Sequence, residues 1–433
     1  MPSAVNTHLL ARLCEFLRVS PTPWHATQNM ATRLEQAGFT PLQETAAWQL
    51  TPGQRYYVTR NDSSIIAFQL PRDRVASLRM IGAHTDSPGL RLKPNATQHA
   101  AGWLQLGVEV YGGALLAPWF DRDLGIAGRV HVRHADGRLE GVLLNVDQPV
   151  AMVPSLAIHL DRDANNGRAI NAQTQMAPVL MQSDSAELTP LLATWLREQH
   201  GLTDVDVVDF ELSFYDLQPP SLIGVNQELV ASARLDNLLS CFMGLEALLA
   251  SDGEQGALFV ANDHEEVGSA SACGAQGPFL GDVLKRINAQ VGGGSEESLI
   301  QLVQSSCMLS CDNAHALHPN FRDKHDEHHG PAINGGPVIK INANQRYATN
   351  SATSALFRDV CREAKVPVQA FVTRADMGCG STIGPITATE VGVPTMDVGI
   401  AQWAMHSIRE TAGTQDVGYL TDALMQFLNR KRL

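Results

Sequence analysis

The sequence predicts an α/β protein with a mainly parallel central sheet, helices on both faces of that sheet, and an inserted, mostly antiparallel β domain. Short β-prone runs alternate with helical patterns in residues 1–92 and again in residues 230–433, which is typical of a parallel sheet. Residues 93–229 instead hold short runs of alternating polarity broken by Gly, Pro and Asp, which is typical of antiparallel strands. We therefore expect one domain in two parts, with the β-rich domain inserted between them.

The elements of the first part and of the insertion follow from these patterns. Leu and Phe recur at helical spacing over residues 6–19, Ser20–Pro23 ends that helix, and a second helix is expected over about 25–37. Apolar runs predict strands at 55–60, 64–70 and 77–83. In the insertion we expect one helix at about 188–200 and strands at 105–111, 128–133, 143–146 and 205–212.

The second part resumes the alternation of strands and helices. A long apolar helix begins near Asp236 and continues to about residue 249. Further helices are expected at 278–290, 351–365 and 415–428, and strands at 257–261, 307–311, 337–341, 368–372 and 394–398. Gly292–Ser295 is expected to be a flexible turn.

Composition and charge exclude several classes of protein. The 433 residues are 44% hydrophobic and 18% charged, which is ordinary for a globular chain, and no apolar run approaches the roughly 20 residues that span a membrane. The formal net charge of −13 and the absence of a basic run argue against a nucleic-acid partner. Seven scattered cysteines without a Cys-x-x-Cys pair suggest free thiols, and therefore a cytoplasmic protein.

Ionisable side chains follow the ends of several predicted strands. Ligands of open α/β sheets bind beyond the carboxyl ends of the strands, so these side chains should converge. They are His84, the pair Glu265-Glu266, Asp312, His406 shortly beyond the strand at 394–398, and Asp236 where a helix begins. Five such ligands with one spare carboxylate are what two neighbouring zinc-like ions need, with one carboxylate left as a base.

Each of these residues also has an ordinary structural explanation. Asp236 could cap its helix, His84 could be a hydrogen-bonded core histidine, and Asp312 could begin a turn. Together these explanations require several strand ends to gain ligands by coincidence, so we prefer the metal site. Gly268 rules out a His-Glu-x-x-His helix, and the histidine-rich segment 325–329 is interpreted as a solvated loop.

At this point the sequence resembles the aspartyl aminopeptidases. The resemblance is carried in order by six blocks that span nearly the whole chain, together with Trp119–Leu124 of the insertion: 82–88, 233–238, 263–269, 312–320, 336–348 and 404–410. It implies a dinuclear zinc aminopeptidase that removes N-terminal Asp or Glu from peptides, with Mn²⁺ or Co²⁺ as possible substitutes for the two Zn²⁺.

The resemblance also implies a role for each site residue. Asp236 bridges the metals, His84 and Asp312 complete one site, and Glu266 and His406 complete the other, so His264 is not needed. Glu265 is the general base, Asp86 orients His84, and His315 steadies the oxyanion. The resemblance implies that Lys340 binds the acidic side chain of the substrate, with a solvated strand-end lysine as the alternative, and Met405 is a further expected contact. Gly380 lies in a glycine-rich turn whose backbone could approach a ligand or could simply connect a strand to a helix.

The family assembles as a closed shell, commonly a dodecamer built from dimers, and the resemblance implies the same homo-oligomer here. His159, in the loop 154–160, is the residue expected to reach a neighbouring active site, although Ser155 stands where family members often carry histidine. Two alternatives remain: a neutral-residue aminopeptidase or amidohydrolase on the same scaffold, and a non-catalytic shell or cargo-binding protein. Retention of Glu265 favours an enzyme.

Overall fold

The computed structural model describes residues 6–433, and the chain divides into two compact units. The first unit comprises Met1–Asp86, Pro220–Met405 and Glu410–Leu433, and the second comprises Ser87–Pro219 and His406–Arg409. The second unit overlaps the insertion expected at 93–229 but begins and ends a few residues earlier. Among the helices of residues 6–433, none is long and apolar enough to cross a membrane.

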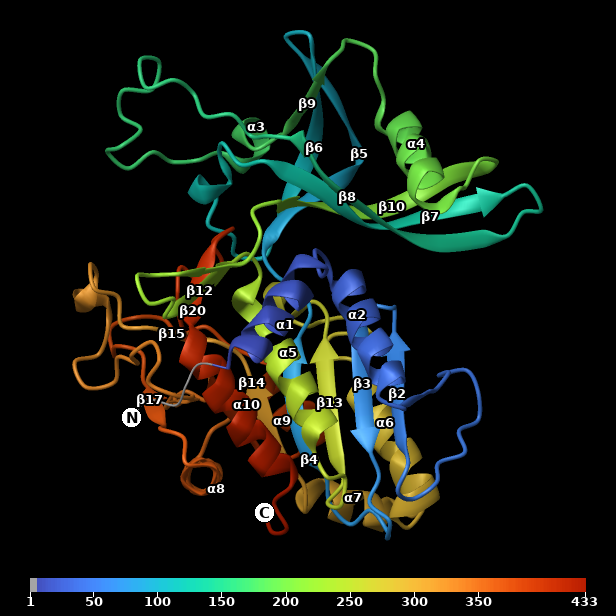
Figure 1. Cartoon of the computed structure of the whole chain (residues 1–433), viewed down its shortest axis with the longest axis vertical. Helices are drawn as coiled ribbons and strands as arrows, with labels where there is room; N and C mark the ends of the chain where they lie inside the picture. Colours follow the sequence, from blue (N-terminus) through green and yellow to red (C-terminus); the bar gives the residue numbers. More distant parts are fainter. Residues whose placement is uncertain (1–5) are drawn as a thin grey trace. The chain divides into compact units, whose positions relative to one another are not determined.

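A nine-stranded sheet forms the centre of the first unit (Figure 1). Its four central strands, β13, β4, β14 and β18, run parallel to one another, while antiparallel pairs flank them. The sheet order is β1 (Thr40–Pro41), β2 (Arg55–Arg60), β3 (Ser64–Gln69), β13 (Ala257–Asn262), β4 (Arg79–His84), β14 (Cys307–Cys311), β18 (Thr395–Gly399), β16 (Val338–Lys340) and β17 (Gln369–Phe371). The expected mainly parallel sheet is confirmed.

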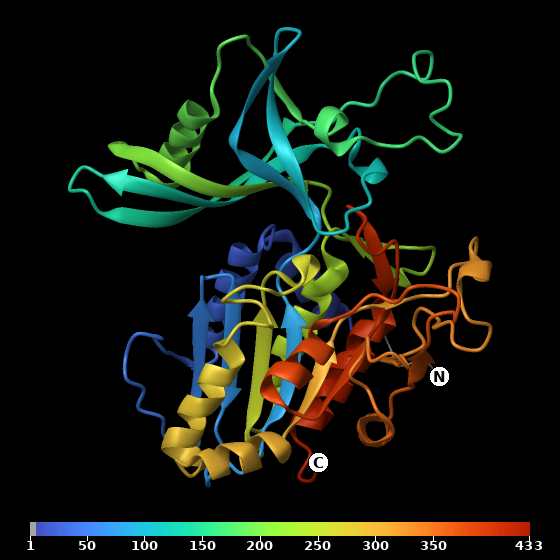
Figure 2. The ribbon, with the colours of Figure 1, turned by 180° about the vertical axis from the view of Figure 1, so that it is seen from behind.

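Helices cover both faces of this sheet (Figures 1 and 2). Side chains alternate along β13, so Phe259 joins the core on one face while Leu258 and Val260 join the core on the other. The first face packs against α1 (Thr7–Arg18), α2 (Pro23–Gln36), α5 (Leu235–Ala250), α8 (Ser351–Ala364) and α10 (Thr414–Leu428). The second packs against α6 (Phe279–Ile287), α7 (Glu296–Gln304) and α9 (Ile383–Val391).

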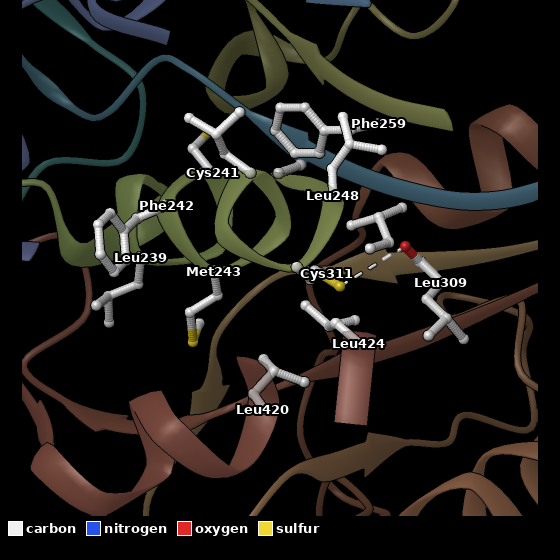
Figure 3. Close-up of a cluster of buried hydrophobic side chains, with 14 of the residues drawn as sticks. Leu239, Cys241, Phe242, Met243, Leu248, Phe259, Leu309, Cys311, Leu420 and Leu424 are labelled. Atoms are coloured by element: carbon white, nitrogen blue, oxygen red, sulfur yellow. Dashed lines mark hydrogen bonds between the residues drawn. The ribbon is translucent and has the colours of Figure 1, made fainter. Parts of the chain in front are cut away.

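Helix α5 is the most deeply buried helix of the first core, which explains its nearly uniform apolar sequence (Figure 3). Phe242, fully buried, packs 5.9 Å from the ring of Phe16, and burial of such a side chain contributes about 1.5–3 kcal/mol. At Gly244 a Cβ atom would approach Phe259 to 2.7 Å, so glycine lets the helix lie close to β13. This packing fixes the start of α5, where Asp236 lies.

A second, five-stranded sheet of the first unit lies in the order β11 (Ser221–Ile223), β12 (Leu229–Ser232), β20 (Glu410–Gly413), β19 (Ala401–Trp403) and β15 (Ala314–His315). β15 follows β14 after two residues, and β19 follows β18 after one. Two strands of the central sheet therefore continue directly into this smaller sheet.

The second unit is a six-stranded antiparallel sheet with one long helix, α4 (Leu188–His200). The strands lie in the order β8 (Leu139–Ala151), β7 (Leu124–His134), β10 (Val205–Asp216), β5 (Gly89–Ala100), β6 (Trp103–Tyr111) and β9 (Val179–Gln182). Leu188, Leu192 and Leu196 of α4 pack into the core of this unit. The expected antiparallel β domain is confirmed.

The sequence patterns did not predict α7 or α9. α7 follows the Gly292–Ser295 segment directly, and Ser295 caps it through a reciprocal pair of bonds with Ser298. α9 contains Gly384, Pro385 and several β-branched residues, which have low helix propensity, so its helical state depends on packing against β4 and β14.

Candidate functional site

The carboxyl ends of the central strands bring together four of the five predicted metal ligands. β4 ends at His84, and the neighbouring strand β14 is followed at once by Asp312. Asp236 lies in the first turn of α5, and Glu266 follows the end of β13. His84, Asp236 and Asp312 form one group, and His84, Glu265 and Glu266 form another, in which the candidate ligand atoms lie within 4.8 Å of one another.

His84 is the centre of this cluster. Its Nε2 atom lies 3.4 Å from Asp236 Oδ1, 3.8 Å from Asp312 Oδ1 and 3.9 Å from Glu265 Oε2. Ligand atoms of one tetrahedral zinc site lie about 3.3–3.8 Å apart, given bond lengths of about 2.0–2.3 Å. The donor atoms are therefore spaced as a metal requires, with only small movements needed to close on it.

Two hydrogen bonds hold the start of α5, where Asp236 lies. The backbone of Asp236 and Asn237 is not helical, and the peptide bond between them is cis. The Asp236 N–H donates to Glu410 Oε2 at 2.8 Å, and the Asn237 side chain donates to the carbonyl of Cys311 at 2.8 Å. The ends of β14 and β20 thus hold the segment that presents the Asp236 carboxylate.

Asp86 connects the histidine to both glutamates. The Nδ1 atom of His84 lies 3.0 Å from the Asp86 carbonyl oxygen and 3.3 Å from Oδ1, an arrangement that leaves Nε2 to act as the ligand. The Asp86 carboxylate also accepts the backbone N–H groups of Glu265 and Glu266, each at 3.1 Å. One buried carboxylate therefore positions three residues of the cluster.

The buried carboxylates of the cluster have raised pKa values, which a bound cation would lower. The pKa of Glu265 is raised to about 7, chiefly by burial; His84 lowers it, and Asp312 and Asp236 raise it. Burial and the nearby Asp236 likewise raise the pKa of Glu266. Crowded carboxylates of this kind ionise together only beside a positive charge, and a set of imidazole and carboxylate donors suits zinc. The residues present therefore fit a metal centre.

Lys340 lies at the end of β16 and is buried. Its Nζ atom donates to the Asn313 carbonyl at 2.9 Å and lies 3.3 Å from Asp312 Oδ2. It also lies 4.9 Å from the centre of the Tyr347 ring. The ammonium is thus held beside a predicted metal ligand, and the alternative of a solvated strand-end lysine does not apply.

A cavity of about 410 Å³ in the first unit contains three further predicted residues, His315, Gly380 and Met405, in its lining. His315 packs edge-on against Phe371 with ring centres 5.6 Å apart. Burial and the nearby Lys340 ammonium lower the pKa of His315, which favours the neutral imidazole. The lining also contains aromatic or apolar side chains and charged ones: Phe321, Tyr347, Phe371, Met377 and Trp403, and Lys324, Asp326 and Arg374.

His406 and His159 belong to the second unit. The His406 Nδ1 atom lies 3.2 Å from the carbonyl oxygen of Gly113, so Nδ1 carries the proton and Nε2 is the nitrogen without a proton in that tautomer. His159 is exposed in a loop that also exposes the apolar side chains of Leu156, Ile158 and Leu160. The two residues remain predictions as metal ligand and intersubunit residue.

The sequence analysis missed one positioning residue, Glu410. It is buried in β20, accepts from Asp236 N–H through one oxygen, and lies 3.2 Å from the Gln402 side chain through the other. The sequence does place an acidic residue at the start of a short segment, Glu410–Gly413, that leads directly into a helix. A carboxylate buried in a strand needs a hydrogen-bond partner, so this position could have been flagged.

Comparisons with known proteins identify the family of the chain. Residues 16–428 match the family model of the aminopeptidase I zinc metalloproteases, the M18 family. A probable M18 family aminopeptidase 2 of Ectopseudomonas mendocina is 54% identical over 99% of this chain and 100% of its own length.

Solved structures show the same relationship. The structure of the Ape4 and Nbr1 complex matches with a TM-score of 0.93 and 39% identity over 99% of this chain and 88% of that one. The S. cerevisiae mApe1 dodecamer matches with a TM-score of 0.84 and 27% identity over 96% of this chain and 95% of that one. The chain therefore belongs to the M18 family of zinc aminopeptidases and is a peptide hydrolase.

Proposed function

We propose that this peptidase removes N-terminal Asp or Glu from peptides, using two metal ions and Glu265 as the general base. The observation that carries the proposal is the buried cluster around His84, in which Asp236 and Asp312 lie at metal-ligand spacing with Glu265 at 3.9 Å. A lone structural histidine would not need three carboxylates from three separate elements.

Asp236 is the proposed bridge between the two ions, because its carboxylate belongs to the same group of candidate ligand atoms as His84 and Asp312. Glu266 and His406 would hold the second ion, with the His406 tautomer fixed by Gly113. Bound zinc ions would supply Lewis acidity, which polarises a carbonyl and acidifies water; Mn²⁺ and Co²⁺ suit the same oxygen and imidazole donors.

Glu265 is the proposed proton carrier. Its backbone N–H donates to Asp86, and its carboxylate is partly buried at the edge of the cluster, 3.9 Å from His84 Nε2. It would accept a proton as water attacks the scissile carbonyl and return it to the departing amine. His315, which lines the cavity, would donate to the carbonyl oxygen as negative charge develops there.

Lys340 is the proposed source of the acidic preference. A cation in a protein of net charge −13 concentrates the attraction for a carboxylate at one place. Gly380 and Met405 line the cavity that would receive the side chain, and Tyr347, which lies under the Lys340 ammonium, lines the same cavity. In this proposal a substrate carboxylate competes with Asn313 and Asp312 for the ammonium.

The same observations favour one second candidate, an aminopeptidase for neutral residues. The Lys340 ammonium already contacts Asp312 and Asn313, and much of the cavity wall is apolar. Under this alternative the Lys340 ammonium only holds the Asp312 carboxylate in place. Phe371 and Met377 then contact an apolar side chain of the substrate.

A panel of N-terminal aminoacyl substrates tests the proposal, measured with and without a chelator and after addition of Zn²⁺, Mn²⁺ or Co²⁺. We expect kcat/KM to be highest for Asp and Glu, to vanish with chelator and to return with metal. A preference for Leu or Met would support the neutral alternative, and hydrolysis of none of the panel by metal-loaded protein would favour a non-catalytic shell protein.

We also propose a cytoplasmic homo-oligomer, a dodecamer built from dimers. The support is the dodecameric relative, the seven free cysteines, and the exposed apolar side chains of the loop 154–160, which suit contact with a second copy. The Ser155 N–H donates to Asp121, which shapes the loop that carries His159. If His159 acts in trans, a dimer-breaking variant should lose activity and keep its metals; an active monomer would contradict this.

A further inference from the structure

A second group of ligand atoms lies beside the glutamate turn, outside the cluster around His84. Asp263, His264 and Cys273 each offer one ligand atom, and these atoms all lie within 4.8 Å of one another. None of the three is used by the proposed dinuclear centre. Asp263 and Cys273 are buried and His264 is partly exposed, so solvent can reach the group on the side of the imidazole.

The spacing of the His264 and Cys273 atoms is close to that of ligands on one ion, because His264 Nδ1 lies 3.5 Å from Cys273 Sγ. Asp263 Oδ2 lies 3.5 Å from the other ring nitrogen, Nε2, so the Asp263 carboxylate has to move to share an ion with Nδ1 and Sγ. Sulfur and nitrogen ligands of a tetrahedral zinc ion lie about 3.5 Å apart. The Ser271 hydroxyl, 2.8 Å from Nδ1 and 3.6 Å from Sγ, adds a fourth polar group at the same place.

Hydrogen bonds from two strands hold the backbone around the group, and the Asp263 carboxylate also accepts from the His264 N–H at 2.8 Å. The Cys273 carbonyl accepts from the Ser64 hydroxyl at 2.9 Å and from the Asn262 side chain at 3.0 Å. The Asp263 N–H donates to Ser64 Oγ at 2.8 Å. Strands β3 and β13 therefore fix both ends of the segment that carries the ligands, which lowers the ordering cost of binding an ion.

We propose that Asp263, His264 and Cys273 form a third cation site, selective for a soft divalent ion such as Zn²⁺ or Cd²⁺. Thiolate and imidazole ligands favour such ions over Mg²⁺ or Ca²⁺. Binding breaks the Cys273 S–H bond, forms a sulfur–metal bond and releases the proton to solvent. This site differs from the dinuclear centre in containing a thiolate.

Occupancy would act on the turn that carries Glu265. The N–H of Ser269 donates to the His264 carbonyl at 2.7 Å, and the N–H of Gly268 donates to the Glu265 carbonyl at 2.9 Å. An ion that draws His264 toward Cys273 therefore pulls on one end of this turn. Excess zinc should consequently change the activity of enzyme whose catalytic centre is already loaded.

Titration of the zinc-loaded full-length protein with Cd²⁺ tests the site directly. The proposed dinuclear ligands include no thiolate, so cadmium exchange there gives no thiolate-to-cadmium absorption in the ultraviolet. We expect this band to saturate at one equivalent per chain in the wild type. The signal does not require hydrolysis, so it is independent of the proposed function.

Variants identify the ligands. Cys273→Ser should abolish the band, and His264→Asn should weaken Cd²⁺ binding at least about 10-fold. Cys14→Ser and Cys379→Ser, which alter the two less buried cysteines, should leave it unchanged. If Cys273→Ser does not fold, His264→Asn still tests the site, because the His264 side chain is partly exposed and its replacement should disturb folding less. A wild type without the band, or a band that survives Cys273→Ser or is unchanged by His264→Asn, would overturn the proposal.

Discussion

Replacement of Asp86 by alanine tests whether one buried carboxylate holds the cluster together. The Asp86 carboxylate accepts two backbone N–H groups, those of Glu265 and Glu266, at 3.1 Å each and lies 3.3 Å from His84 Nδ1. Alanine removes all three contacts and leaves the N–H donors without this acceptor.

The expected loss can be estimated from these contacts. Hydrogen bonds to a charged group contribute about 1.5–3 kcal/mol each, so two lost bonds correspond to roughly 3–6 kcal/mol. His84 Nδ1 keeps the Asp86 backbone carbonyl at 3.0 Å and loses only the carboxylate contact, and loss of a contact that orients a ligating histidine lowers metal affinity by about 10–100-fold. We expect Asp86→Ala to bind metal about 10–100-fold more weakly. At saturating metal it should still hydrolyse substrate at least about 10-fold more slowly. Chelator competition measures the affinity, and initial rates measure turnover.

Asp416 provides a matched control. Its buried carboxylate also accepts two backbone N–H groups, from Asn334 at 2.6 Å and Gly336 at 2.8 Å, but it lies at the start of α10 and contacts none of the predicted ligands. Asp416→Ala should lower the thermal midpoint and leave metal affinity unchanged. The reasoning is refuted if Asp86→Ala keeps wild-type affinity and turnover, or if both variants lose metal affinity equally.

Three further predictions concern the substrate cation, pH and metal. Lys340→Ala should lower kcat/KM about 10- to 100-fold for an N-terminal Asp substrate and much less for Leu; equal losses would assign Lys340 to Asp312 alone. Burial lowers the pKa of His25 from 6.5 to about 4, so folding favours the neutral imidazole. The free energy of unfolding is therefore higher above pH 6.5, by roughly 3 kcal/mol, and this difference is lost as the pH falls toward 4. His25→Asn should flatten that part of the pH dependence of the thermal midpoint, and parallel curves for variant and wild type would contradict it. A chelator should abolish hydrolysis reversibly, and activity in fully metal-free protein would exclude the metal mechanism.

The central strands could be predicted from the sequence because strands buried on both faces form continuous apolar runs. β13 and β14 are such runs, and the polar residues that follow them, Glu265-Glu266 and Asp312, stand out for that reason. Convergence of these residues followed from the rule that parallel strands end at one edge of a sheet. This reasoning brought together the predicted ligands His84, Glu266 and Asp312, and Asp236 was added from the start of its helix.

Contacts that depend on backbone geometry could not be predicted. The two hydrogen bonds from the glutamate turn to Asp86 require the left-handed backbone of His264, with φ of 66°, which the sequence does not reveal. The burial of Lys340 depends on β16 pairing antiparallel with β18, which brings the lysine beside Asp312. Pairing between distant strands is not encoded in local patterns.

The most direct test of the dinuclear centre compares metal content and hydrolysis in the wild type and Glu265→Gln. Glutamine keeps the size of the side chain but cannot accept and return a proton, and the proposed ligands His84, Asp236, Glu266, Asp312 and His406 are untouched. With the Cys273 site blocked by Cys273→Ser in both proteins, elemental analysis should find two metal ions per chain in each. Hydrolysis of an N-terminal Asp substrate should be lost only with Glu265→Gln. A Glu265→Gln protein that hydrolyses at the wild-type rate, or a single ion per active chain, would contradict the proposed mechanism.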